Sequence, residues 1–90
     1  MGYEWLAEAL AALRDIEPYE VIQALSAQRR LPLAGLAGGV RVVVICARTR
    51  AGRPLVVAIR KAGAFDQIII GAREMTPEEL ARFERWEAEG

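Results

Sequence analysis

The sequence contains no histidine and only one cysteine, Cys46, among its 90 residues. Histidine is the commonest general base and metal ligand, so a Ser-His-Asp triad, a Cys-His pair and a zinc site with histidine ligands are all excluded. A single cysteine excludes an intrachain disulfide and a metal site built from several thiolates, which fits a reducing compartment. Any chemistry must therefore come from carboxylates, tyrosines and arginines, and we expect neither a cofactor nor a metal.

Long hydrophobic runs are also missing. The longest uninterrupted apolar stretch, residues 42–47, is far shorter than the roughly 20 residues of a membrane-spanning helix. The N-terminus carries Glu4 and Glu8 before its first basic residue, Arg14, and this charge is wrong for a secretory signal. We therefore expect a cytoplasmic protein with no membrane partner. We expect residues 1–90 to form one domain, and a core this small favours stabilisation by a partner.

Lysine is almost absent, since all basic residues except Lys61 are arginine. The formal net charge is zero, because 12 basic residues balance 12 acidic ones. The charges are nevertheless segregated: residues 1–20 sum to −4, residues 21–73 to +8 and residues 74–90 to −4. A basic region between acidic ends can present a cationic surface that the total conceals, so nucleic acid is not excluded as a partner.

The first part of the chain, residues 1–28, is predicted to be helical. Leucines at positions 6, 10 and 13 recur at helical spacing and indicate a helix over residues 3–14. Pro18 suits the first turn of a second helix. The next stretch, residues 29–39, contains a proline and three glycines and is predicted to be a loose connection, with Arg29 and Arg30 near the C-terminal end of the second helix.

Residues 40–74 are predicted to form strands. Two runs rich in valine and isoleucine flank the turn signal Ala51-Gly52 and indicate an antiparallel hairpin, in which a two-residue turn places Arg53 opposite Arg50. These runs are apolar on both faces, which favours a central position in the sheet. A turn over residues 62–66 leads to a third strand. The predicted strands are residues 40–49, 54–60 and 67–72.

The last element, residues 76–89, has the clearest local signature. Thr76 is a helix N-cap, Pro77 occupies the first helical position, and Glu79 completes a capping box. The whole pattern predicts an α+β fold: a small antiparallel sheet of about three or more strands, packed with two N-terminal helices and one C-terminal helix.

A family resemblance covers the run from Ala47 to Trp86, ARTRAGRPLVVAIRKAGAFDQIIIGAREMTPEELARFERW. This run is similar to the C-terminal half of the BrnT-like toxins of bacterial toxin–antitoxin pairs. In that family a Gly-Arg hairpin leads into a strand, then into a strand ending in Ala-Arg, and then into a helix with Glu and an aromatic residue. Gly52-Arg53, residues 68–73 and residues 78–83 stand at those places, whereas the N-terminal part is only loosely similar.

The resemblance implies an endoribonuclease with a fold related to RelE toxins, inhibited by a small DNA-binding antitoxin. Family members commonly carry a histidine near the N-terminal helices, and this chain has none. An inactive or differently acting relative is therefore the alternative within the family.

Cleavage of RNA at its own 2′-hydroxyl needs a base, positive charge for the phosphorane and a proton donor for the leaving oxygen. Without histidine, either a glutamate or a tyrosine is expected to serve as base, and arginines bind the phosphate. We predict Arg53, Arg73 and Glu78 as catalytic residues. The predicted substrate-binding residues are Arg48, Arg50 and Arg60.

Each candidate also has a structural interpretation. The arginines near the hairpin tip can simply be solvated side chains that protect strand edges. Arg73 lies at a strand end, where a functional arginine can be fixed, but a salt bridge to Glu74, Glu78 or Glu79 is the alternative. Cys46, inside an apolar strand, is interpreted as a buried structural thiol.

Two classes of function remain open from the sequence. The first is a ribonuclease toxin that acts on single-stranded mRNA and pairs with an antitoxin. The second is a noncatalytic RNA-binding or protein-binding module, or a homodimer that buries its apolar sheet against itself. The missing histidine favours the module, and the clustered arginines favour contact with RNA.

Overall fold

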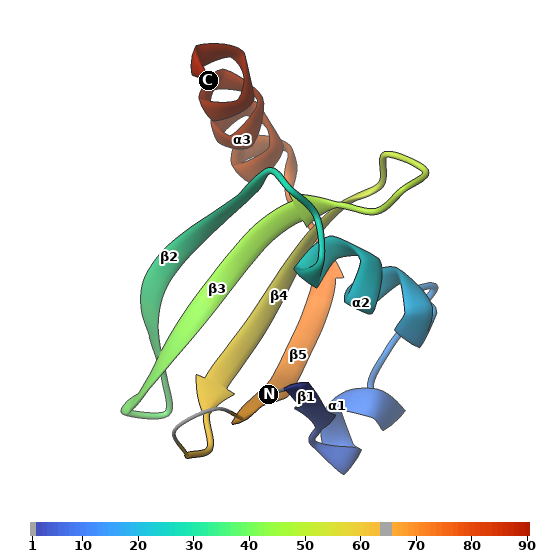
Figure 1. The fold of residues 1–90 in the computed structure, drawn as a ribbon, viewed down its shortest axis with the longest axis vertical. Coiled ribbons are helices and arrows are strands. Elements are labelled where there is room, and N and C mark those ends of the chain that lie inside the picture. Colours follow the sequence, from blue (N-terminus) through green and yellow to red (C-terminus); the bar gives the residue numbers. More distant parts are fainter. Residues whose placement is uncertain (1, 64–65) are drawn as a thin grey trace.

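The computed structural model describes residues 2–63 and 66–90, and over these residues the chain forms one five-stranded sheet and three helices (Figure 1). This arrangement confirms the α+β class. The sheet order is β1-β5-β4-β3-β2. The strands are β1 (Gly2–Trp5), β2 (Arg30–Ala37), β3 (Val40–Arg48), β4 (Pro54–Lys61) and β5 (Asp66–Glu74), and the helices are α1 (Ala7–Ala11), α2 (Pro18–Leu25) and α3 (Pro77–Glu89).

The sheet is mixed, so the prediction of a purely antiparallel sheet is wrong at one edge. β1 pairs with β5 in parallel, with Trp5 opposite Ile69, whereas all other neighbouring strands pair antiparallel. The predicted helix over residues 3–14 is correspondingly wrong at its start, because α1 covers only Ala7–Ala11. Tyr3 and Trp5 are aromatic, a type favoured in strands, and both pack against the buried cluster beneath α2.

β2 is a strand where the sequence predicts a loose connection, and that prediction is wrong. Arg30–Ala37 pairs antiparallel with β3 along its whole length. Pro32 is tolerated because β2 lies at the sheet edge, where an absent backbone N–H need not remove a ladder hydrogen bond. Gly38 and Gly39, with φ of +57° and +82°, then turn the chain into β3.

The antiparallel pairing of β3 with β4 confirms the predicted hairpin, but its loop is longer than expected. Arg48 pairs with Pro54, and the Thr49 N–H donates to the Arg53 carbonyl at 2.9 Å. Arg53 therefore lies opposite Thr49 and not opposite Arg50. The strand after the hairpin, β5, contains the predicted residues 67–72 and extends them in both directions. Residues 64 and 65 of the predicted turn lie outside the described residues.

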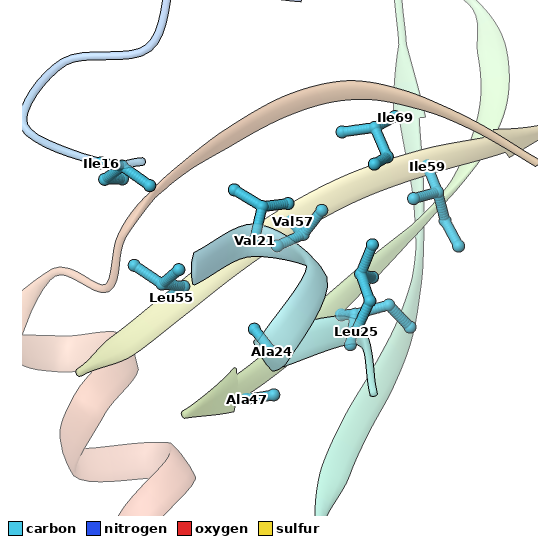
Figure 2. Packing of buried hydrophobic residues seen from close by; sticks show 10 residues of the cluster. Ile16, Val21, Ala24, Leu25, Ala47, Leu55, Val57, Ile59 and Ile69 are labelled. Atoms are coloured by element: carbon cyan, nitrogen blue, oxygen red, sulfur yellow. The ribbon is translucent and has the colours of Figure 1, made fainter. Parts of the chain in front are cut away.

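The larger buried cluster lies between α2 and one face of the sheet (Figure 2). Val21, Ala24 and Leu25 of α2 are almost completely buried and meet the strands. The Arg30 guanidinium donates to the Leu25 carbonyl at the end of α2, where the helix dipole favours a cation. The sheet side chains of this cluster are Ile45, Ala47, Leu55, Val57, Ile59 and Ile69.

α3 packs on the opposite face of the sheet, at one end. Its predicted start is confirmed, because the Thr76 side chain and Glu79 form a complete capping box with Pro77 in the first turn. Phe83 is the only α3 side chain that is almost fully buried, in a small cluster with Cys46 and other residues. Figure 1 shows α3, in red, projecting beyond the end of the sheet. The other members of the small cluster are Val56 and Met75, with Leu31, Val44, Leu80 and Trp86 packed against it.

Candidate nucleic-acid interface

Three of the arginines predicted from the sequence lie on the face of the sheet that α3 partly covers, which we call the α3-side face. Val56 pairs with Cys46 of β3 and with Arg73 of β5, so these side chains form one row across three adjacent strands. Side chains alternate along a strand. Arg48, two residues after Cys46, and Arg60, four residues after Val56, therefore project from the same face.

Arg53 and Arg50 lie away from this face. The Arg53 guanidinium pairs with Glu20 of α2 at 3.0 Å and with Glu74 at 3.3 Å. These two carboxylates, Glu74 first, raise the pKa of Arg53. Arg50 is exposed in the hairpin loop beside α2. The structure thus ties Arg53 to the α2 side and does not bring it together with Arg73.

Arg73 forms a bidentate pair with Glu79 in the first turn of α3, with N–O distances of 2.6 and 2.8 Å. Among the alternatives open from the sequence, Glu74, Glu78 and Glu79, the partner is Glu79. Arg73 and then the Thr76 backbone N–H lower the pKa of Glu79 to about 2. Glu79 is therefore an anion at neutral pH, and it occupies the guanidinium edge that a phosphate would use.

Arg48 is held by the last turns of α3. Its Nε and Nη2 each donate to a Glu87 carboxylate oxygen at 3.0 Å, and Glu84 lies 3.6 Å from Nη2. The guanidinium also lies 5.6 Å from the centroid of the Phe83 ring. Glu87 raises the pKa of Arg48, and Arg48 lowers the pKa of Glu87. Two of the three arginines on this face are therefore already paired with carboxylates of α3.

The opposite end of the sheet carries cations without such partners. Arg41, Arg60 and Lys61 border a hollow of about 550 Å³ at the ends of β2, β3 and β4. Within the described part of the chain, none of the three forms an ion pair. The remaining residues around the hollow are apolar: Ala34, Gly35, Leu36, Val42 and Val43. The sequence prediction included Arg60 but missed Arg41 and Lys61, which the β3–β4 register brings to the same end.

A shallow depression of about 270 Å³ lies beside Arg73, between the two ends. Ala58 lines it and leads along β4 to Arg60, two residues further. The α3-side face thus offers a mostly apolar floor with cations at both of its ends. The other residues that line the depression are Val44, Val56, Gly71 and Ala72.

The side chains that could transfer a proton are less favourably placed than the arginines that could bind an anion. Glu78, the predicted base, is exposed in the first turn of α3, and none of the described arginines pairs with it. Cys46 is buried, and burial raises the pKa of its thiol, as expected for a structural cysteine. Residues 2–63 and 66–90 contain no cluster of three or more His, Cys, Asp or Glu side chains suited to a metal ion.

The chain matches no protein-family model, and no curated protein is significantly similar to it. Among the described residues, no helix is both long enough and apolar enough to cross a membrane. The site must therefore be interpreted from its own geometry.

Proposed function

We propose that this protein binds single-stranded RNA on the α3-side face and that it is the endoribonuclease of a toxin–antitoxin pair, as its resemblance to BrnT-like toxins implies. The observation that supports the proposal most is the presence of Arg48, Arg60 and Arg73 on three adjacent strands of one face. Guanidinium groups stay charged at all physiological pH values and meet phosphate oxygens through two parallel hydrogen bonds.

The spacing of these arginines suits an extended strand of RNA. Arg60 lies four residues along β4 from Val56, the partner of Arg73, which corresponds to about 13 Å of strand. Such a span exceeds one phosphate group, so the two arginines contact different phosphates of one strand. The apolar depression between them accommodates ribose or base surface.

Cleavage in this proposal is an attack by the RNA on its own backbone. Glu78 takes the proton of the 2′-hydroxyl, the 2′-oxygen bonds to the adjacent phosphorus, and the bond from phosphorus to the 5′-oxygen breaks. Arg73 stabilises the negative charge of the phosphorane, and the departing 5′-oxygen takes a proton from water. The products are a 2′,3′-cyclic phosphate and a 5′-hydroxyl.

A noncatalytic RNA-binding module is the second candidate. It is favoured by the absence of histidine and by Glu78, which is exposed and forms no ion pair among the described residues. The two candidates share the same binding surface, and they differ in whether bound RNA is cut and whether a DNA-binding antitoxin is needed as a partner.

Induced expression in a bacterial host tests the toxin proposal. We expect the wild-type chain to arrest growth and Arg60→Ala to relieve the arrest, because Arg60 forms no ion pair with any described residue whose loss would unfold the protein. Arg50→Ala is the matched control, since it removes the same charge away from the α3-side face. Normal growth with soluble, folded wild-type protein contradicts the toxin proposal, and binding of RNA without cleavage then favours the noncatalytic module.

A further inference from the structure

One helix supplies the carboxylates that pair with two of the three arginines on the α3-side face. Glu79, in the first turn of α3, holds Arg73 at 2.6 and 2.8 Å, and Glu87, in the last turns, holds Arg48 at 3.0 Å. Both pairs are bidentate, the arrangement by which a guanidinium binds a phosphate. The carboxylates of α3 therefore sit where RNA phosphates would bind.

The attachment of α3 to the sheet is small. Phe83 is its only almost fully buried side chain, and the cluster around it is separate from the larger one beneath α2, on the other face of the sheet. At its far end, Arg29 donates to the carbonyls of Trp86 and Glu87 and lies 4.7 Å from the Trp86 ring centroid. Release of α3 would therefore leave the larger core beneath α2 in place.

We propose that α3 is an internal competitor of RNA: its carboxylates Glu79 and Glu87 occupy Arg73 and Arg48 in the free protein and are displaced when RNA phosphates bind. This inference rests on the proposed RNA-binding function and adds its regulation. Arg60, at the end of the face away from α3, has no such competitor and makes the first contact with RNA. Displacement of the carboxylates then extends the contact toward Arg73 and Arg48.

The test is the affinity for a fluorescently labelled 2′-O-methyl RNA of 12 nucleotides, which cannot be cleaved at the 2′-oxygen. Glu87→Gln is compared with Glu89→Gln, a change of the same charge two residues away at a carboxylate that forms no ion pair among the described residues. We expect Glu87→Gln to tighten binding about threefold to fivefold and Glu89→Gln to change it less than about twofold. A Glu79→Gln, Glu87→Gln double variant should bind about tenfold more tightly, and Gln at position 79 still completes a capping box.

Equal affinities for Glu87→Gln, Glu89→Gln and the wild type overturn the competition by α3 while the RNA-binding function stands. Equal gains for Glu87→Gln and Glu89→Gln also overturn it, because they show an effect of net charge alone. If no form binds the RNA, the proposed function fails and the competition fails with it. If the double variant does not fold, the comparison of Glu87→Gln with Glu89→Gln still tests the competition by α3.

Discussion

Both ends of the α3-side face carry arginines, but the arginines at one end are paired with carboxylates and the arginine at the other end is unpaired among the described residues. At the end covered by α3, Arg48 and Arg73 each face a carboxylate of that helix across a bidentate contact. At the other end, Arg60 borders an apolar hollow together with Arg41 and Lys61, which project from the opposite face because side chains alternate along a strand. None of the three forms an ion pair within the described residues. The difference shows that the side chains around an arginine, and not the residue type, determine whether its charge is paired within the fold.

The difference between the two ends also explains why the net charge of zero does not reveal a cationic surface. Carboxylates of the acidic helix α3 pair with the arginines at the end that the helix covers, whereas the cations at the opposite end form no ion pair among the described residues. Charges paired within the fold contribute modestly to its stability, whereas unpaired cations that gather at one hollow create a local positive potential.

We expect the greatest loss of stability when the buried Phe83 side chain, which packs α3 against the sheet, is removed. Phe83→Ala should lower the free energy of unfolding by about 3 kcal/mol, because a side chain with 1% exposure leaves a cavity in a small cluster. Urea unfolding measures this change, and hydrogen exchange should show α3 losing protection before β3 and β4. A loss below about 1 kcal/mol would show that α3 is not held by this cluster.

The second prediction compares Arg48, which is paired with a carboxylate, with Arg60, which forms no ion pair among the described residues. Arg48→Ala should cost about 1 to 2 kcal/mol of stability, since it leaves the half-buried Glu87 without its partner. Arg60→Ala should change stability by less than about 0.5 kcal/mol. Thermal or urea unfolding of the two variants side by side checks this, and equal losses would remove the distinction between the two ends.

Acid titration of stability isolates the Arg73 contact. The pKa of Glu79 is lowered from its ordinary value of 4.5 to about 2 in the folded protein, so Glu79 adds stability above pH 4.5 that disappears as the pH falls toward 2. Because both side chains are partly exposed, we expect this contribution to be about 1 kcal/mol. Glu79→Gln should lose that part of the pH dependence. An unchanged acid profile in this variant would contradict the assignment.

The smallest effect is expected at Arg50. Arg50→Ala should change stability by less than about 0.5 kcal/mol and leave RNA affinity within about twofold of the wild type, because Arg50 is exposed on the α2 side of the hairpin. Unfolding and RNA titrations measure both quantities. A loss of affinity comparable to that of Arg60→Ala would extend the RNA surface around the hairpin tip.

The elements that the sequence predicts are those whose signals are local. The capping box of α3 and the valine-rich runs of β3 and β4 each stand within a short stretch of sequence and are confirmed. β1 is only four residues long and is defined by its pairing with the distant β5, and β2 contains proline and glycine, which usually indicate a connection. Both strands depend on tertiary contacts that no local pattern reveals.

The candidate site was predictable in composition but not in arrangement. The sequence indicates that arginines matter in the strand region, and it also offers the salt bridge of Arg73 as an alternative. Arg53 and Arg73 are separated because Arg73 pairs with Val56, three residues after Arg53, so the two arginines project from opposite faces. The grouping of Arg41 with Lys61 follows from the β3–β4 register. Register depends on the turn geometry and on which strands pair, and the local sequence pattern identifies neither the longer β3–β4 loop nor the distant partner strands.

In the proposed function, RNA phosphates bind the α3-side face and the cations around the hollow at its unpaired end. The most direct test measures the affinity for a labelled 2′-O-methyl RNA of 12 nucleotides across 50 to 300 mM KCl, for the wild type and for the Arg41→Ala, Arg60→Ala, Lys61→Ala variant. We predict that wild-type affinity falls steeply with salt and that the variant has a logarithmic salt slope smaller by about 2, because each lost phosphate contact removes about 0.7. Affinity that does not depend on salt, or a slope for the variant equal to that of the wild type, would contradict RNA binding at this surface.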